Sequence, residues 1–144
     1  MAEGKMSRIK HIAISSQDPI KTSKFYKDSF GLTEVGEINN ENVEGFYLSD
    51  GYINLAILNF KTEALAGEEF GTNFSGLHHI GFQVDDAEAA DINLKKAGSS
   101  PREDINSAFQ SQMGKGHGGK NSEMKYSAPD EVLIDISQDG WVGT

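Results

Sequence analysis

Residues 76–85 read Gly-Leu-His-His-Ile-Gly-Phe-Gln-Val-Asp, a short strand pattern that carries two adjacent histidines. Successive side chains of a strand point to opposite faces, so we expect His78 and His79 to serve different purposes. His78 shares its face with apolar residues, which predicts a structural role beneath a helix or a hydrogen bond to the backbone. His79 shares its face with Gly81 and a glutamine, and this small, polar face leaves room for a ligand.

The pattern around His79 occurs once before in the chain. Residues 8–15 form an earlier strand pattern with a histidine in its middle, and an aspartate that can cap a helix follows both strands. A glycine of the kind that ends helices closes each expected helix. The offsets are 68 residues for the histidines, 68 for the aspartates and 67 for the glycines: His11 and His79, Asp18 and Asp86, Gly31 and Gly98. Three matched offsets predict an internal repeat of two modules.

Each module is expected to contain one strand, one helix and three further strands. The first spans about residues 7–60, a linker covers about 61–75, and the second module spans about 76–138. The second module holds a glycine-rich insert of loop composition at about residues 106–122. We therefore expect an α+β fold with two βαβββ modules in a single domain over residues 1–144.

Composition argues against several classes of partner. The net charge of −9 and the pI of about 4.8 disfavour nucleic acid and anionic membranes, because either needs a basic surface. No apolar run approaches the roughly 18 residues of a membrane helix, and residues 1–5 show no export-signal pattern. Cysteine is absent, so the chain has no disulfide and no thiolate ligand for a metal. We expect a cytoplasmic protein whose partner is a small molecule.

Three polar residues stand at comparable places on the expected strands. His11 lies in the middle of the first strand of module one, His79 has the same place in module two, and Asp135 lies on the last strand. Two imidazoles and one carboxylate are the composition of a facial triad, which leaves coordination positions open for substrate. They suit divalent Fe, Mn, Ni, Co or Zn, and the sequence does not choose among these. The alternative is a two-module scaffold in which the histidines only fill a core.

These motifs resemble the vicinal oxygen chelate superfamily, which includes glyoxalases, extradiol dioxygenases, methylmalonyl-CoA epimerase and bleomycin resistance proteins. The resemblance covers roughly residues 7–138. Its most specific marks are His11-Ile-Ala, His79-Ile-Gly-Phe-Gln-Val-Asp, and Pro129-Asp130 before Ile134-Asp135-Ile136. The resemblance implies a curled mixed sheet around a metal-binding cavity, as in glyoxalases and dioxygenases. It also implies that His11, His79 and Asp135 are metal ligands, with Asp135 as the catalytic candidate.

Two departures from the superfamily pattern bear on the ligand set. Members with four protein ligands carry Glu, His or Gln on the last strand of module one, where this chain reads Tyr52-Ile53-Asn54-Leu55. The amide oxygen of Asn54 is only a weak candidate contact for a metal or a substrate. Asp135 also replaces the more usual glutamate, which shortens the reach by one methylene. The resemblance therefore implies a three-ligand site, closer to the dioxygenase and fosfomycin-resistance arrangement than to the glyoxalase one.

Five further residues are candidates for lining a substrate cavity. Arg102 is a candidate clamp for a carboxylate. His117 lies in the glycine-rich insert, where it either reaches the site on closure or belongs to a solvated loop. For the other four candidates, a role in the fold is an equally good interpretation. The five are Asn54, Gln83, Arg102, Tyr126 and His117.

The function we expect is that of a divalent-metal-dependent enzyme acting on a small molecule whose oxygen atoms chelate the metal. The reaction class stays open among glyoxalase-like isomerisation or lyase chemistry, ring cleavage by an extradiol dioxygenase, and epimerisation. The alternative is a metal-free small-molecule binding protein of the bleomycin-resistance type, although such proteins lack the ligand set. A homodimer is a possible assembly, and the sequence leaves open whether one chain or two supply the ligands.

Overall fold

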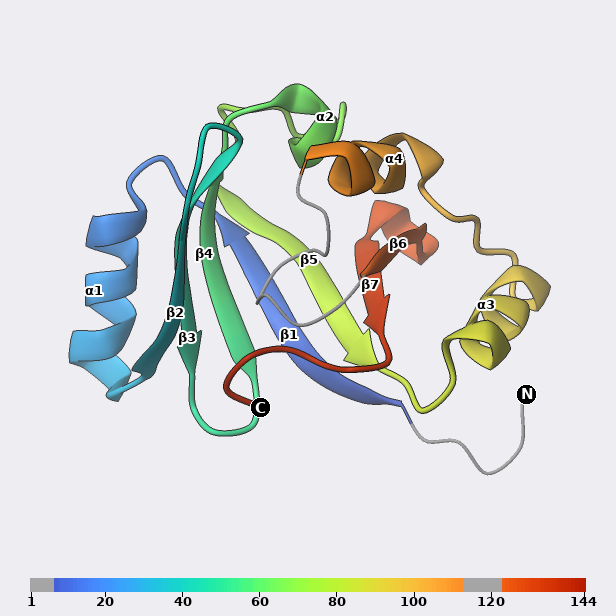
Figure 1. Cartoon of the computed structure of the whole chain (residues 1–144), viewed down its shortest axis with the longest axis horizontal. Coiled ribbons are helices and arrows are strands. Elements are labelled where there is room, and N and C mark those ends of the chain that lie inside the picture. The colour runs from blue at the N-terminus through green and yellow to red at the C-terminus, as the bar shows by residue number, and fades with distance from the viewer. Residues whose placement is uncertain (1–6, 113–122) are drawn as a thin grey trace.

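The structure, a computed structural model, describes residues 7–112 and 123–144 of the chain. The strands are β1 (Arg8–Ser15), β2 (Thr33–Asn39), β3 (Val43–Ser49), β4 (Asn54–Phe60), β5 (Gly76–Gln83), β6 (Met124–Ser127) and β7 (Leu133–Ser137), and the helices are α1 (Pro19–Phe30), α2 (Glu63–Ala66), α3 (Ala87–Lys96) and α4 (Glu103–Gln112). Within the described residues these strands form one mixed sheet in the order β2-β3-β4-β1-β5-β7-β6 (Figure 1). None of the helices in this part of the chain is long and apolar enough to cross a membrane.

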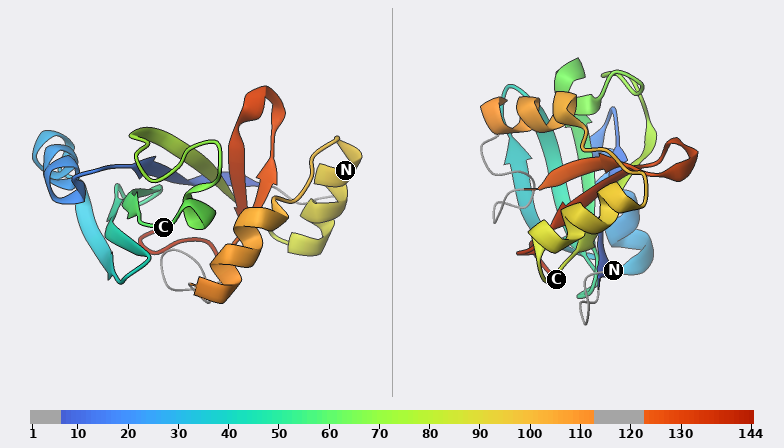
Figure 2. Two further views of the ribbon diagram at one scale, coloured as in Figure 1. Left: turned by 90° about the horizontal axis from the view of Figure 1, so that it is seen from above. Right: turned by 90° about the vertical axis from the view of Figure 1, so that its right-hand side faces the viewer.

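The two modules meet in the middle of the sheet. β1 pairs in parallel with β4 of its own module and antiparallel with β5 of the second module. β5 in turn pairs in parallel with β7. The first strand of each module therefore lies at the junction, which brings the two repeated histidines close together. The predicted α+β class and the curled mixed sheet are confirmed, and α1 and α3 lie at opposite ends of the molecule (Figures 1 and 2).

The helices that follow the first strands begin and end as the repeat predicts. Asp18 accepts a hydrogen bond from the backbone N–H of Lys21, and Gly31 closes α1 in the left-handed conformation, at a φ of 71°. Asp86 accepts hydrogen bonds from the backbone N–H groups two and three residues later in α3. A side-chain cap of this kind stabilises a helix by about 1 kcal/mol. Local sequence thus determines where both helices start.

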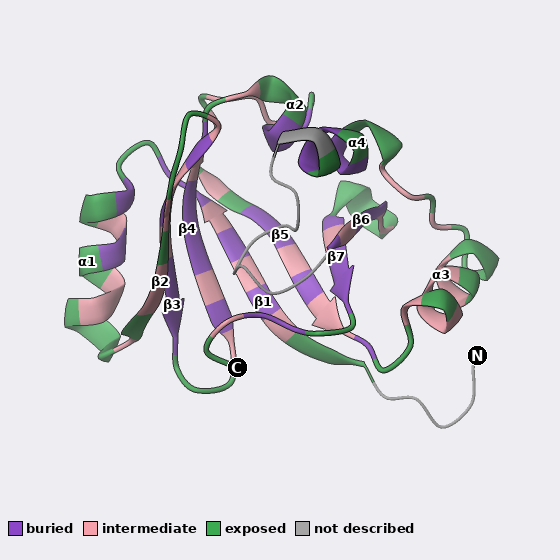
Figure 3. Ribbon diagram, viewed as in Figure 1, coloured by how far each residue is buried: buried purple, intermediate pink, exposed green. Residues whose placement is uncertain are grey.

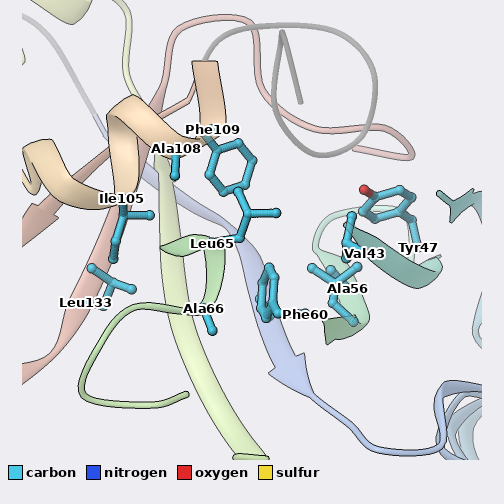
Figure 4. Packing of buried hydrophobic residues seen from close by; sticks show 12 residues of the cluster. Val43, Tyr47, Ala56, Phe60, Leu65, Ala66, Ile105, Ala108, Phe109 and Leu133 are labelled. Carbon is cyan, nitrogen blue, oxygen red and sulfur yellow. The ribbon is translucent and has the colours of Figure 1, made fainter. Parts of the chain in front are cut away.

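One face of the sheet, the inner face, carries the main hydrophobic core. Side chains of β3, β4 and β7 pack there with α2 and α4, and Figure 4 shows this cluster. A smaller cluster lies on the opposite face, where residues of α3 contact it. Buried residues concentrate in the central strands and in α4, whereas α1 and α3 carry mostly exposed or half-buried residues (Figure 3). Polar residues on the inner face are therefore removed from water and need partners within the protein.

The second module differs from the prediction after α3. Residues 106–112, which the sequence analysis assigned to a loop insert, belong to α4, and residues 113–122 lie outside the described residues. Ile105, Ala108 and Phe109 are buried at the i, i+3, i+4 spacing of an amphipathic helix. The polar residues between them obscured this signal in the sequence.

The predicted linker and the strand expected after α3 differ as well. The linker contains the short helix α2, whose first turn is capped by Thr62. Directly after α3, the structure has an isolated bridge between Pro101 and Tyr126 in place of a strand. Proline cannot donate to a strand ladder, so pairing does not extend through this point. Among the described residues, module two therefore contributes β5, β6 and β7 to the sheet.

Candidate metal centre

A row of residues crosses the inner face of the sheet from β6 to β4. Strand pairing places Lys125 beside Asp135, Asp135 beside Gly81, Gly81 beside His11, and His11 beside Asn54. Directly paired residues share a face of a sheet, so five strands contribute to one line of side chains. Because Gly81 has no side chain, the row has a gap between His11 and Asp135.

A β-bulge turns both adjacent histidines toward this face. Ala13 of β1 pairs with His79, but the next residue of β1 pairs with Leu77, which leaves His78 outside the ladder. An extra residue in one strand breaks the alternation of faces. His78 consequently contacts the ring of Phe60, a buried residue of the inner core, with ring centroids 4.8 Å apart. The expectation that the two histidines face opposite ways is wrong.

Four potential metal ligands meet at this point. The Nε2 atoms of His11 and His79 lie 3.1 Å apart, and Asp135 Oδ2 lies 2.9 Å from His79 Nε2 and 3.9 Å from His11 Nε2. Glu123, just before β6, completes a group whose ligand atoms all lie within 4.8 Å of one another. All four residues are buried. They come from one chain, so no second chain is needed to assemble the group.

The hydrogen bonds of Asn54 determine which nitrogen of His11 carries the proton. The amide Nδ2 of Asn54 donates to the backbone carbonyl of Val142 at 2.9 Å, so its Oδ1 is the atom that faces His11 Nδ1 at 2.8 Å. An amide oxygen can only accept, and His11 Nδ1 must therefore be the donor. In the neutral ring this leaves a lone pair on Nε2, which faces His79 and Asp135.

A second chain of hydrogen bonds orients His79 in the same way. His78 Nε2 lies 2.6 Å from the backbone carbonyl of Ala66 and must donate to it. The other nitrogen of a neutral His78 is then an acceptor, and it lies 2.7 Å from His79 Nδ1. His79 Nδ1 is thus the donor and its Nε2 carries the lone pair. The structural role predicted for His78, including its bond to the backbone, is consistent with these contacts.

Three acceptor atoms therefore face one another in a buried place. Lone pairs on two imidazole nitrogens and a carboxylate oxygen repel at the separations of 2.9 and 3.1 Å seen here unless a cation lies among them. Ligands bound about 2.1 Å from a metal stand roughly 3.0–3.4 Å from one another at octahedral or tetrahedral angles. Two of the three separations are close to this range, and the third, between His11 Nε2 and Asp135 Oδ2, is longer at 3.9 Å. The chemistry of the donor set fits a divalent ion of the Fe, Mn, Co, Ni or Zn group. The residues that could hold it are His11, His79, Asp135 and Glu123.

Lys125 places a positive charge beside this group. Its Nζ lies 2.8 Å from Asp135 Oδ1 and 4.3 Å from the centre of the Phe109 ring, and the residue is 1% exposed. One carboxylate oxygen thus faces the ammonium group and the other faces the histidines. Burial alone would raise the pKa of Asp135, but the charge of its neighbours, with the Lys125 ammonium group at 2.8 Å, outweighs burial and holds this pKa well below its ordinary value. Asp135 is therefore a carboxylate, the form that binds a cation.

Burial also keeps the histidines in the neutral form that binds metals. It lowers the pKa of His11 to about 4, although the charge of Asp135 acts in the opposite direction. Burial likewise lowers the pKa of His78 to about 4 and that of His79 well below its ordinary value. At neutral pH all three rings are uncharged, in agreement with the hydrogen-bond assignment.

These lowered pKa values predict that the metal-free protein loses stability as the pH falls from about 6.5 to about 4. In that interval the histidines of the unfolded chain bind protons while those of the folded chain do not, so the free energy of unfolding decreases. Each of His11 and His78 contributes on the order of 3 kcal/mol over the full interval. Chemical denaturation at several pH values measures this. His78→Phe, which lacks one of the groups, should show a smaller loss, and a flat profile for the wild type would contradict the assignment.

The chain after β7 covers the row, crossing β5 and β1 toward β4 (Figure 1). The Trp141 ring stacks on the His11 ring, with centroids 4.7 Å apart and an interplanar angle of 1°, and Trp141 is 1% exposed. Gly81 makes this approach possible, because a Cβ there would lie 2.8 Å from two carbons of the Trp141 ring. The gap in the row is thus filled by an aromatic ring from outside the sheet.

The remaining candidates from the sequence analysis have partners elsewhere in the chain. Asn54 bonds to His11, as described above. Gln83 donates to a backbone carbonyl just after β7 at 3.3 Å, and Arg102 bonds to two carboxylates outside the group. Tyr126 donates to an aspartate of α3 at 2.6 Å, on the opposite face of the sheet. His117 lies outside the described residues, and a substrate-binding role for any of the five stays a prediction.

Three residues of the site were not predicted from the sequence. Glu123 and Lys125 alternate with apolar or aromatic residues, so they share a face of the β6 region. Which face that is depends on the pairing of β6 with β7, and a four-residue strand does not reveal its register. Trp141 lies beyond the last strand, where no periodicity places a side chain. The one signal that could have drawn attention to it is that it is the single tryptophan of the chain.

The two repeats thus form one curled mixed sheet, with a buried group of histidines and carboxylates at their junction. The family model described as Glyoxalase/Bleomycin resistance protein/Dioxygenase superfamily matches residues 8–134. The chain therefore belongs to this superfamily, and the resemblance stated from the sequence is confirmed.

The relatives within the superfamily are more specific. Mitochondrial methylmalonyl-CoA epimerase of Mus musculus is 28% identical over 96 residues, which cover 64% of this chain and 54% of the mouse protein. The Homo sapiens protein of the same name is 28% identical over 95 residues, 63% of this chain and 54% of the human protein. The chain thus spans about half the length of the curated relatives it matches.

Solved structures support the fold. A hypothetical protein from Bacillus halodurans has a TM-score of 0.65 at 20% identity, with 90% of this chain and 92% of that chain covered. A Streptomyces coelicolor methylmalonyl-CoA epimerase in complex with 2-nitronate-propionyl-CoA has a TM-score of 0.61 at 24% identity, with 90% and 92% covered.

Proposed function

We propose that this chain is a metal-dependent enzyme that holds one divalent ion at His11, His79 and Asp135 and moves a proton at a carbon next to a carbonyl group. The main observation in support of a metal site is the orientation of the two imidazole rings. Each ring donates its Nδ1 proton to a fixed partner, so both Nε2 lone pairs face Asp135 Oδ2. Such outer hydrogen bonds are what orient histidine ligands in metal sites.

The two carboxyl groups of the site have different surroundings, and we assign them different roles. A divalent ion held there would act as a Lewis acid on the oxygen atoms of the substrate and acidify the adjacent carbon. Asp135 lies between Lys125 and the histidines, which suits a ligand. Glu123 is then the carboxyl group for proton transfer, at its Oε atoms. The catalytic role predicted for Asp135 passes to Glu123 in this proposal.

The reaction class follows from the relatives and from this pair of roles. The curated relatives are named methylmalonyl-CoA epimerases, and an epimerisation requires removal and return of a proton next to a carbonyl group. A buried carboxyl group beside a Lewis-acid site can do this without any redox step. We therefore favour an isomerase acting on an acyl thioester or a similar carbonyl acid over ring cleavage or lyase chemistry.

Deuterium exchange tests the proposal. The metal-loaded protein is incubated with methylmalonyl-CoA in deuterium oxide, and mass spectrometry follows deuterium at the carbon between the two carbonyl groups. We expect exchange well above the rate without protein, and Glu123→Gln should lower it by about 100-fold or more while the bound metal is retained. Turnover of a hemithioacetal or a catechol instead, without exchange, would contradict the proposed reaction and assign one of the other chemistries of the superfamily.

A metal-free binding protein is the second candidate, and Lys125 is the observation that favours it. Its ammonium group already neutralises part of the charge of Asp135, so the buried carboxylate has a cation without any metal. In that case methylmalonyl-CoA would raise the melting temperature of the metal-free protein without being converted.

A further inference from the structure

The residues after β7 follow the same row that carries the candidate ligands. This strap, residues 140–143, passes over Gly81 and His11 with Trp141, over Asn54 with Val142, and over the end of β3 with Gly143. The strap is held to β4 and β3 by hydrogen bonds from side chains. Asn54 Nδ2 of β4 donates to the carbonyl of Val142 at 2.9 Å, and Ser49 Oγ of β3 donates to the carbonyl of Gly143 at 2.6 Å. Ser49 pairs with Asn54 in the sheet, so it extends the row by one strand.

Trp141 restricts the ring of His11. The two rings are stacked in parallel, and the Trp141 ring also closes the space above Gly81, which adjoins His11 in the sheet. Rotation of the imidazole out of its plane would separate the stacked faces or drive it against the indole. The strap therefore fixes the plane in which His11 Nε2 approaches His79 and Asp135.

Val142 acts on His11 through Asn54. An asparagine amide can turn by half a rotation with little change in shape, which exchanges its oxygen and its NH2 group. The carbonyl of Val142 accepts only from NH2, so it fixes the oxygen of Asn54 toward His11 Nδ1. The reversed amide would present donors to Nδ1 and move the ring proton to Nε2, where it would block the lone pair that faces the ligand group.

We propose that the strap is a positioning element of the candidate metal centre, in which Trp141 holds the ring plane of His11 and the Val142 carbonyl holds its tautomer through Asn54. The inference rests on the proposed function, because it names what holds one ligand of the same centre. The pairing of the strands does not require a further segment across β5, β1 and β4. The strap is irregular chain laid across strands that are already paired on both sides.

The test compares Trp141→Leu, which removes the stacked ring, with Trp141→Phe, which keeps an aromatic face. Leu58→Ala is the matched control, because it also opens a space in the buried inner core but lies beside Ser15, four residues along β1 from His11. Long-range proton–nitrogen correlation spectra of the metal-free proteins report the tautomer of His11. We expect a single Nδ1–H tautomer in the wild type, Trp141→Phe and Leu58→Ala. We expect a mixture of both tautomers in Trp141→Leu, because a strap that has lost its stacked indole no longer holds the neighbouring Val142 carbonyl against Asn54.

Metal affinity gives the second readout. We expect Trp141→Leu to bind a divalent ion at least about tenfold more weakly than the wild type, with Trp141→Phe restoring most of the difference. Should Trp141→Leu fail to fold, Ser49→Ala removes the anchor of Gly143, together with one bond that Ser49 accepts from the N–H of Gly51, and should show the same two changes at smaller size.

The two proposals fail separately. If Trp141→Leu and Ser49→Ala both keep the wild-type tautomer and the wild-type metal affinity, the strap is only a cover and the inference is overturned. If the wild type binds no metal but its His11 tautomer still depends on Trp141, the positioning role stands and the proposed enzyme function is overturned.

Discussion

Asp135→Asn is expected to abolish binding of divalent metals and to lower the free energy of unfolding by about 3–5 kcal/mol. The carboxylate is fully buried, with one oxygen 2.8 Å from Lys125 Nζ and the other 2.9 Å from His79 Nε2. Asparagine removes the anionic ligand and leaves the ammonium of Lys125 buried without a counter-charge. Urea denaturation measures the loss of stability, and equilibrium dialysis measures the loss of metal.

The double variant Asp135→Asn with Lys125→Met separates these two effects. Removing both charges removes the cost of the unpaired ammonium, so most of the stability should return. Metal binding should not return, because the ligand is still absent. If the double variant is as unstable as the single one, the loss of stability in Asp135→Asn does not come from the unpaired ammonium group of Lys125.

Gly81→Ala has the second-largest expected effect, a destabilisation of about 3 kcal/mol together with loss of metal affinity. A Cβ at this position would lie 2.7 Å from the Cβ of His11 and 2.8 Å from two ring carbons of Trp141. The His11 Cβ cannot rotate away, so either the strands separate or the Trp141 ring leaves its place. Chemical denaturation and a metal titration of the same variant measure both consequences.

Gly36→Ala on β2 is the matched control. Its three nearest neighbours would be side-chain atoms, with a carbon of Tyr47 at 3.1 Å and a carbon of Val142 at 3.8 Å, which is an ordinary van der Waals contact. We expect a cost below about 1 kcal/mol and no change in metal affinity. Equal effects of the two substitutions on stability and metal affinity would show that the close packing of His11 and Trp141 at Gly81 is not what makes Gly81→Ala costly.

The fold could be predicted because its signals repeat. The offsets between His11 and His79, and between Asp18 and Asp86, identified two modules before any pairing was known. Helix caps are local, so the positions at which α1 and α3 begin were readable from a few residues. The helix α4 was missed because its apolar residues are few and lie among polar ones.

The candidate site could be predicted only where polar residues repeat between the modules or stand at a comparable place on a strand. His11, His79 and Asp135 were identified from their places on strands, and the structure brings their ligand atoms together. The inner position of His78 depends on a bulge, which is a property of the pairing between β1 and β5 and leaves no mark in the composition. Lys125 and Trp141 reach the site through the register of β6 and through a segment without secondary structure. Both depend on tertiary packing, which no local pattern encodes.

Titration of the metal-free protein with cobalt, followed by the emission of Trp141, tests the central claim most directly. Trp141 is the one tryptophan of the chain and stacks on His11, so an ion bound beside that ring should quench its fluorescence. The account predicts quenching that saturates at one ion per chain, confirmed by elemental analysis, and its absence in His79→Ala. If the wild type binds none of the iron, manganese, cobalt, nickel or zinc ions, or if His79→Ala binds them equally well, the metal centre proposed here does not exist.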